Sequence, residues 1–310
     1  MRKYIDKFIL NLQGKNFSKH TLCAYKKDTN RFLDFLKQRG KTKLSAFNKT
    51  QIRAYLSYLQ TLKLSRNSLL RGIAVLRSYS KFLISHDLIK TDPFKLLPLP
   101  KREKLLPRFL TEDELSKLIS ASQFSKRDCA IIELLYSSGL RRSEAVSLNV
   151  GDIDFYGAVV RVMGKGSKER IVPVTKNALQ AIKDYLLERK TPVQSQEPLF
   201  LNKNRTRLSG HGLSLILKKT SLKSNILRKI TPHEIRHSFA THLLNHGCDI
   251  RSLQEMLGHK NIATTQTYTH VSLKHLKKVY DKSHPRNRNK SPLPPFDPRQ
   301  KNSGAGKGGV

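Results

Sequence analysis

Six residues of the sequence have side chains suited to breaking a phosphodiester bond. In chain order they are Arg141, Lys165, His233, Arg236, His259 and Tyr268. A tyrosine hydroxyl is a nucleophile once its proton is removed, and histidine and lysine can accept and donate protons. Arginine is permanently charged and planar, so it can hold two phosphate oxygens at once. If the six residues meet in space, they could cut the bond with no metal ion and no other cofactor.

The pair His233 and Arg236 falls at the start of a predicted helix. Thr231 is a suitable N-cap and Pro232 a suitable first helical residue. Residues three apart share a helical face, here close to free N–H groups and to the positive end of the helix dipole. This arrangement favours anion binding, although the pair alone is equally typical of a solvent-exposed helix.

The same stretch, His233-Glu-Ile-Arg-His237, also matches the zinc-protease pattern H-E-x-x-H. A metzincin would continue with glycine at position 240 and histidine at position 243, but the chain has Ala240 and Leu243. Arg236 would also bring a permanent cation towards the divalent metal, which charge repulsion disfavours. We therefore expect no metal site here and keep a zinc metalloprotease as the rival from another enzyme class.

The segment before His259 is predicted to be a short helix. Asp249 can cap it, apolar residues follow at helical spacing, and Gly258 ends it. His259 would then follow the helix end directly, where it could point back into a cleft. Tyr268 comes nine residues later in a threonine-rich stretch.

The chain is strongly basic, with 59 Lys and Arg against 23 Asp and Glu and a formal charge of +36. Its first hundred residues contain 21 Lys and Arg, five Asp and no Glu. A surface of one sign repels itself, and a bound polyanion relieves that repulsion, so DNA or RNA binding is expected.

Ordinary globular patterning argues against a ribosome-type protein. No apolar run approaches the roughly 20 residues of a membrane span, so no membrane partner is expected, and the charged N-terminus is unlike a secretory signal, which predicts a cytoplasmic protein.

Patterning divides the chain into two domains and a tail. Residues 1–90 are predicted to form an N-terminal helical bundle that binds DNA. One of its helices is expected to be capped at Ser18 or Thr21, and another at Ser65. Residues 91–108 are rich in proline and cations and are expected to form an extended linker. Residues 284–310 combine proline, glycine and cations with few apolar side chains, and are expected to be disordered.

Residues 109–283 are predicted to form the catalytic domain, of α+β type. The domain opens with a capping-box pattern at Thr111 and is otherwise mostly helical. Its exception is a β-hairpin, because residues 159–163 and 170–174 alternate between apolar and polar around a glycine-containing turn. Lys165 would lie near the hairpin tip. The fold class expected for the whole chain is therefore mainly α with a small β-hairpin or sheet.

Five segments contain the six residues and follow one another in a fixed order. They are Gly139-Leu-Arg141-Arg-Ser-Glu144, Gly164-Lys165-Gly-Ser-Lys-Glu-Arg-Ile-Val-Pro, His233-Glu-Ile-Arg236-His-Ser-Phe-Ala-Thr-His-Leu-Leu, Leu257-Gly-His259 and Thr264-Thr-Gln-Thr-Tyr268-Thr-His-Val. Together they resemble the signature boxes of the tyrosine recombinase (phage-integrase-like) family. The likeness runs from about residue 3 to residue 286, and its last residues are similar to the Xer branch.

The resemblance implies a role for each of the six residues. Arg141 would be the first catalytic arginine, because the register of its box favours it over Arg142. His233 and Arg236 would be the His-x-x-Arg pair. Glu144 matches a position that commonly holds a carboxylate, and we expect it to support an arginine.

The remaining three residues would complete the reaction. Lys165 would be the hairpin lysine that protonates the departing 5′ oxygen, His259 the second histidine, and Tyr268 the nucleophile. The product implied by the resemblance is a 3′-phosphotyrosyl link beside a free 5′-OH.

The resemblance further implies a site-specific recombinase acting on double-stranded DNA. It would work as a tetramer on two DNA sites, alone or as a hetero-tetramer with a second Xer recombinase, under a DNA translocase as regulator. Its task would be resolution of chromosome or plasmid dimers at cell division. A mobile-element integrase is the nearest alternative. A type IB topoisomerase would share the chemistry, and a basic DNA-binding regulator only the charge.

Overall fold

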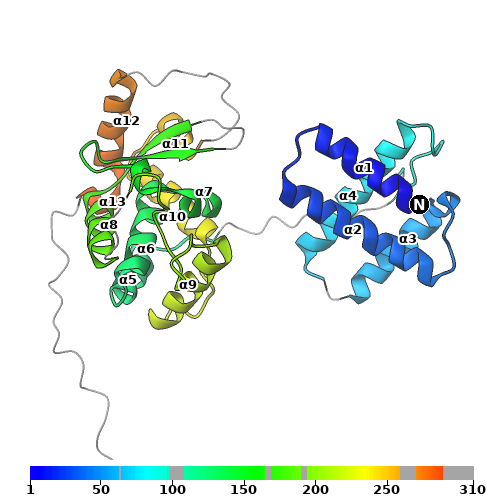
Figure 1. Cartoon of the computed structure of the whole chain (residues 1–310), viewed down its shortest axis with the longest axis horizontal. Helices are drawn as coiled ribbons and strands as arrows, with labels where there is room; N and C mark the ends of the chain where they lie inside the picture. Colours follow the sequence, from blue (N-terminus) through cyan, green and yellow to red (C-terminus); the bar gives the residue numbers. More distant parts are fainter. Residues whose placement is uncertain are drawn as a thin grey trace, which may run out of the picture. The chain divides into compact units, whose positions relative to one another are not determined.

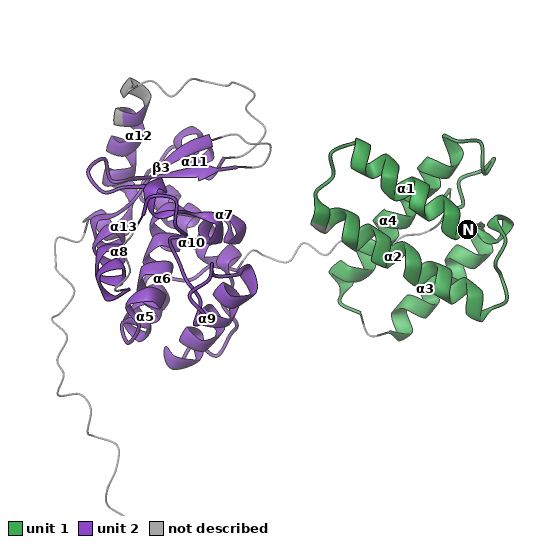
Figure 2. Cartoon of the chain, viewed as in Figure 1, with its two compact units in different colours: residues 1–105 green, residues 106–310 purple. Residues whose placement is uncertain are grey.

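The structure, a computed structural model, describes residues 1–62, 64–95, 97, 108–164, 169–189, 194–258 and 270–288. The chain divides into two compact units, residues 1–105 and 106–310 (Figures 1 and 2). Each unit has its own hydrophobic core. The expected fold class, mainly α with a small sheet, is confirmed.

Unit 1 is a helical bundle. Its elements are α1 (Arg2–Gly14), α2 (Lys19–Gln38), a 3-10 turn (Leu44–Ala46), α3 (Lys49–Thr61) and α4 (Arg66–Ile84). The predicted caps are present, because the hydroxyl oxygens of Ser18 and Ser65 accept hydrogen bonds from backbone N–H groups in the first turns of α2 and α4. The helices bury an aromatic core in which Phe8 lies 5.2 Å from Tyr79 and 5.4 Å from Phe82, centroid to centroid. The regular spacing of apolar residues therefore produces a bundle with one packed interior.

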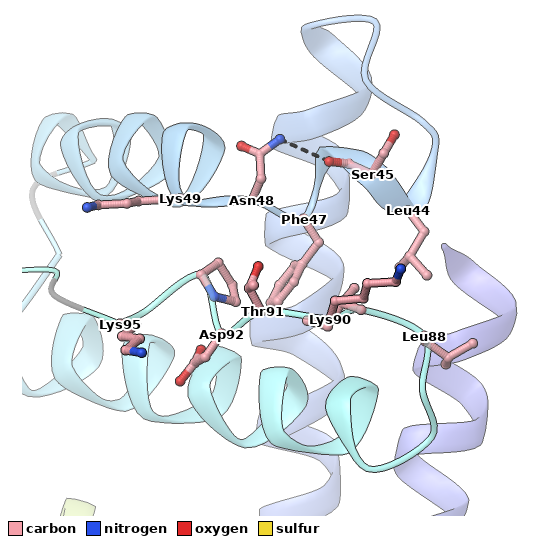
Figure 3. A pocket seen from close by; sticks show the side chains of 12 residues that line it. Leu44, Ser45, Phe47, Asn48, Lys49, Leu88, Lys90, Thr91, Asp92 and Lys95 are labelled. Atoms are coloured by element: carbon pink, nitrogen blue, oxygen red, sulfur yellow. Dashed lines mark hydrogen bonds between the residues drawn. The ribbon is translucent and has the colours of Figure 1, made fainter.

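The packed part of unit 1 extends beyond residue 90. The carboxylate of Asp92 accepts hydrogen bonds from the Ser80 hydroxyl at 2.8 Å and from the Phe94 N–H at 3.0 Å. Phe94 is buried in the bundle core. The start of the segment expected as a linker thus returns across the bundle and forms one wall of a pocket, opposite Asn48 and Lys49 (Figure 3). Residues 98–107 lie outside the described residues.

Unit 2 contains the sheet and the remaining helices. Its elements are α5 (Glu112–Ser122), α6 (Lys126–Ser138), α7 (Arg142–Ser147), a 3-10 turn (Val150–Asp152), β1 (Ile153–Asp154), β2 (Val159–Met163), β3 (Glu169–Pro173), α8 (Lys176–Glu188), α9 (Gly210–Lys223), α10 (Pro232–Asn245), α11 (Ile250–Leu257), α12 (His270–Ser283) and α13 (Pro285–Arg288). The predicted capping box at Thr111 is present, as are the N-caps at Thr231 and Asp249.

Helix α6 is the centre of unit 2, where it packs against α5, α8 and α10. The sheet is antiparallel with strand order β1-β2-β3. In its register Val160 pairs with Val172, and Val162 pairs with Arg170. All four residues are buried, so a charged side chain occupies an inward position of the sheet.

The C-terminal boundary expected from composition is wrong by a few residues. His284 and Pro285 are buried, and α13 continues the folded unit to Arg288. The imidazole of His284 lies among the rings of Tyr136, Phe239 and Tyr280. A basic, proline-containing stretch is typical of disorder, but here long-range aromatic contacts hold its first residues. Residues 289–310 lie outside the described residues. None of the described helices is both long and apolar enough to span a bilayer.

Candidate active site

The structure brings Arg141 together with the pair His233 and Arg236, which lies on the first turn of α10. Arg141 is the N-cap of α7, and all three residues line one pocket. The full lining of this pocket is Arg141, Arg142, Ser214, Lys229, Ile230, Thr231, Pro232, His233 and Arg236. The other three predicted site residues, Lys165, His259 and Tyr268, lie outside the described residues.

Arg141 is held by Glu144, one turn further along α7. The Glu144 carboxylate accepts a hydrogen bond from the Arg141 backbone N–H at 2.7 Å and another from its Nη1 at 2.8 Å. The Arg141 side chain remains 42% exposed, whereas the Glu144 side chain is only 5% exposed. Glu144 therefore holds the backbone N–H and one end of the guanidinium of Arg141, and the rest of the guanidinium stays open to the pocket.

Glu144 also binds Arg170, a residue that the sequence reasoning missed. Nη1 and Nη2 of Arg170 donate to the two Glu144 oxygens, each at 2.9 Å, in a two-point ion pair. The Arg170 side chain is 6% exposed. The strand pattern contained a signal for it, because Arg170 alternates with the apolar Val172 and Val174 and so falls on the inward face of β3.

Arg236 is buried, and its guanidinium is bonded to backbone carbonyls. Its Nη1 donates to the Gly139 oxygen and its Nη2 to the Leu257 oxygen, both at 2.7 Å. These carbonyls belong to the C-terminal ends of α6 and α11, where a helix leaves its last carbonyls without intrahelical partners. Arg236 therefore ties α10 to two helix ends.

Three consecutive carbonyls at the end of α11 accept hydrogen bonds from three different arginines. The Met256 oxygen accepts from Arg170 Nε at 3.0 Å, and the Leu257 oxygen accepts from Arg236. The Gly258 oxygen accepts from Arg141 Nη2 at 3.4 Å. Because the C-terminal end of a helix carries partial negative charge, it stabilises this group of cations. The main chain then passes directly from Gly258 to His259.

The cluster carries more positive than negative charge. Arg141, Arg170 and Arg236 surround the single carboxylate of Glu144, at distances from 2.8 to 3.9 Å. Burial, followed by the positive charge of Arg141, lowers the pKa of Arg236 to about 10. Burial alone would raise the pKa of Glu144, but hydrogen bonds and charges from Arg170 and Arg141 outweigh it and lower that pKa to about 2. A bound anion would balance the excess charge, so the pocket is suited to a phosphate.

The zinc-protease motif has a different structural use. Glu234, the acid of the motif, accepts hydrogen bonds from the Thr231 N–H at 2.8 Å and from Arg228 Nη1 at 3.2 Å. It thereby completes the capping box of α10. Across the described part of the chain, no three His, Cys, Asp or Glu side chains are grouped so that they could hold a metal ion. The helix start therefore serves to present His233 and Arg236 to the pocket.

Two family models match the chain, one in each unit. The Phage integrase family model matches residues 108–275, and the model for the Phage integrase N-terminal SAM-like domain matches residues 5–87. The SAM-like match falls on the helical bundle of unit 1. The larger match includes all six predicted site residues.

Curated relatives cover nearly the whole chain. A "Tyrosine recombinase XerC" of Oceanobacillus iheyensis is 41% identical over 299 residues, which are 93% of this chain and 98% of the relative. A protein of the same name from Thermodesulfovibrio yellowstonii is 41% identical over 91% of this chain and 96% of its own. A "Tyrosine recombinase XerD" of Oceanobacillus iheyensis is 40% identical over 88% of this chain and 94% of its own.

Solved structures share the fold at lower identity. The XerH site-specific recombinase bound to its difH substrate, in a pre-cleavage complex, matches with a TM-score of 0.64 and 22% identity over 83% of this chain and 78% of its own. The integrase of the transposon Tn1549, in complex with transposon right-end DNA, matches with a TM-score of 0.64 and 22% identity over 89% of this chain and 98% of its own. The family models and the curated relatives agree with the resemblance seen in the sequence. The chain therefore belongs to the phage integrase family of tyrosine recombinases.

Proposed function

We propose that the chain cuts and rejoins double-stranded DNA at specific sites through a 3′-phosphotyrosyl intermediate. The proposed catalytic residues are Arg141, Lys165, His233, Arg236, His259 and Tyr268. The observation that carries the proposal is the arginine cluster around Glu144, which opens into a pocket with His233. No metal ion or other cofactor is needed for the reaction.

The arginines match the charge that develops during cleavage. When a nucleophile attacks a phosphodiester, the non-bridging oxygens gain negative charge in a five-coordinate transition state. Arg141 and Arg236 line the pocket and can donate to these oxygens, with His259 supplying a further hydrogen bond. Preorganised donors of this kind are commonly the largest contribution to catalysis.

The bond changes balance without an external energy source. The hydroxyl oxygen of Tyr268 bonds to phosphorus while the bond from phosphorus to the 5′ oxygen breaks. His233 accepts the proton of Tyr268, and Lys165 gives a proton to the departing 5′ oxygen. One phosphoester replaces another, so a 5′-OH can reverse the step, and a 5′-OH from a second duplex gives strand exchange.

The elements that flank the nucleophile segment support this assignment. Gly258 directly precedes His259 in the chain, and its carbonyl oxygen accepts a hydrogen bond from Arg141 Nη2. On the other side, α12 begins at His270, two residues after Tyr268. This helix is fixed to the core of unit 2, since the Tyr280 hydroxyl donates to the Ser137 oxygen at 2.7 Å. Segment 259–269 is therefore attached at both ends to unit 2.

We further propose Xer-type resolution of chromosome or plasmid dimers in the cytoplasm at cell division. The support is that relatives named XerC and XerD match this chain almost equally, at 41% and 40% identity. The assembly would be a tetramer on two DNA sites, either of this chain alone or with a second Xer recombinase. A DNA translocase would act as regulator. Basic unit 1 would bind the duplex beside the cleavage point.

The test uses a nicked suicide duplex in the presence of EDTA. On such a duplex the fragment carrying the 5′-OH diffuses away after cleavage, so a covalent protein–DNA adduct accumulates. We expect the wild-type chain to form this adduct, and Tyr268→Phe to form none while binding DNA with similar affinity. An adduct that persists in Tyr268→Phe would overturn the assignment of the nucleophile. Holliday-junction products would distinguish a recombinase from a type IB topoisomerase. Proteolytic activity that EDTA abolishes would instead favour a zinc metalloprotease.

A further inference from the structure

We propose that Arg170 is a positioning residue of the cleavage site. It holds Glu144 in the position from which Glu144 orients Arg141 towards the phosphate. It also holds the end of α11, which directly precedes His259 in the chain. This inference rests on the proposed function and adds to it a residue that acts through Glu144 without touching the DNA.

All three nitrogens of the Arg170 guanidinium are engaged by groups of the site. Nη1 and Nη2 bind the two oxygens of Glu144, and Nε binds the Met256 carbonyl. These partners lie 26 and 86 residues away in the chain. A planar group with donors committed in three directions cannot rotate without breaking a bond, so Arg170 fixes Glu144 and α11 relative to β3.

Arg170 does not face the pocket, unlike the similarly buried Arg236, which lines it, so Arg170 is not placed to be a phosphate ligand itself. Its side chain is 6% exposed, against 42% for Arg141. It is not among the residues that line the pocket. Its contribution must therefore pass through the groups that it holds.

The charge of Arg170 determines how much of the charge of Arg141 is available to DNA. With Arg170 in place, each Glu144 oxygen accepts one hydrogen bond from the Arg170 guanidinium and a second from Arg141, through its Nη1 at one oxygen and its backbone N–H at the other. Arg236 lies 3.9 Å from the same carboxylate. Without Arg170, only Arg141 and the more distant Arg236 would balance Glu144, so the carboxylate would offset a larger share of the charge of Arg141. The cluster would then attract a phosphate less strongly.

The same residue restricts the turn that leads into His259. Gly258 has a φ of +63°, and a Cβ atom placed there would lie 3.0 Å from Arg170 Cδ. Arg170 therefore lies against the end of α11 at two places, where it binds the Met256 carbonyl and where its side chain passes beside Gly258. The backbone immediately before His259 is held against this side chain.

The experiment measures single-turnover cleavage of a saturating suicide duplex by Arg170→Lys and Arg170→Gln. Lysine keeps the charge but loses the two-point geometry, and glutamine loses both. We expect the cleavage rate constant to fall about 10-fold for lysine and about 100-fold for glutamine, the range seen when groups that orient a ligand are replaced. The fraction of protein that finally reacts should stay at the wild-type level. The overall DNA affinity should change much less than the cleavage rate constant, because it is spread over many phosphate contacts of a basic chain.

Arg189→Lys is the matched control. Arg189 is another enclosed arginine of unit 2, with a 7% exposed side chain that donates to Glu197 at 2.6 Å and to the Pro198 carbonyl at 2.8 Å. It should lose stability in chemical denaturation much as Arg170→Lys does, yet cleave at the wild-type rate. A general loss of folding would lower the reacting fraction in both variants and leave the rate constant unchanged.

A double-mutant cycle tests the route through Glu144. In a Glu144→Gln background, Arg170→Lys should slow cleavage by clearly less than about 10-fold, because one of the two groups that Arg170 holds is already altered. Three results would each overturn the inference and leave the proposed function intact. They are a wild-type cleavage rate in Arg170→Gln, an effect confined to the reacting fraction, and an unchanged 10-fold effect of Arg170→Lys in the Glu144→Gln background. Absence of any wild-type adduct would overturn both.

Discussion

Arg236 donates a 2.7 Å hydrogen bond to the carbonyl oxygen of Leu257, two residues before His259. The bond joins the His-x-x-Arg turn of α10 to the end of α11, 21 residues further along the chain. Arg170 and Arg141 bind the carbonyls on either side of Leu257. Hydrogen bonds therefore join all three arginines to the end of α11, directly before His259 in the sequence.

If Arg141 balances phosphate charge, its importance should depend on that charge. We expect Arg141→Ala to slow cleavage of an ordinary duplex by about 10²- to 10³-fold, the usual effect of removing one preorganised donor. On a duplex with a neutral methylphosphonate at the cleavage point, the same variant should lose far less. Rates on the two substrates are compared in single-turnover assays. Arg161→Ala, at an exposed arginine of β2 that donates to the Gly151 carbonyl, serves as control. Equal losses on both substrates would show that Arg141 does not act through charge.

Gly258 should be needed for two separate reasons. Alanine in the left-handed region costs about 1–2 kcal/mol, and its Cβ would in addition crowd Arg170. Gly247 has a φ of +81° with nothing within 4 Å of a Cβ, so Gly247→Ala measures the backbone cost alone. We expect Gly258→Ala to be destabilised by about 1 kcal/mol more than Gly247→Ala in urea denaturation. Equal losses in the two variants would mean that Arg170 yields without cost.

Much of the local structure followed from the sequence, because it depends on near neighbours. Thr231, Pro232 and the spacing of His233 and Arg236 predicted a helix start that faces an anion site, and the structure places both side chains in one pocket. Asp249 and Gly258 correctly bounded α11.

What the sequence could not supply depends on long-range contacts. Nothing near Arg170 indicates that its partners are Glu144 and Met256, because they lie on other elements of the fold. The burial of His284 depends in the same way on rings from α6, α10 and α12, so composition alone predicted disorder there. The catalytic roles of all six residues remain predictions. Those of Arg141, His233 and Arg236 are supported by their shared pocket, and those of Lys165, His259 and Tyr268 by the resemblance and the flanking elements.

His284 should make the fold sensitive to acid. Burial is the main reason why the pKa of His284 falls from its ordinary 6.5 to about 3. Between these values the unfolded chain binds a proton that the folded chain does not, so stability decreases as the pH falls below about 6.5, by about 1.4 kcal/mol per pH unit from this residue. His284→Phe should flatten the dependence of unfolding free energy on pH between 6.5 and about 4.5.

The control for this measurement is His275→Phe, at an exposed position of α12. It should retain the wild-type slope in urea denaturation across the same pH series. A wild-type slope in His284→Phe would instead assign the acid sensitivity to other groups, such as His242, whose pKa burial also lowers.

The central claim is tested most directly by identifying the bond between protein and DNA. The adduct formed on a suicide duplex is digested with trypsin, and the DNA-linked peptide is analysed by mass spectrometry. Trypsin releases residues 261–274 as one peptide, in which Tyr268 is the only tyrosine. We predict that this peptide carries the DNA through a 3′-phosphate on Tyr268, and that the released strand ends in a 5′-OH. Attachment through a 5′-phosphate, or to any other residue, would contradict the account.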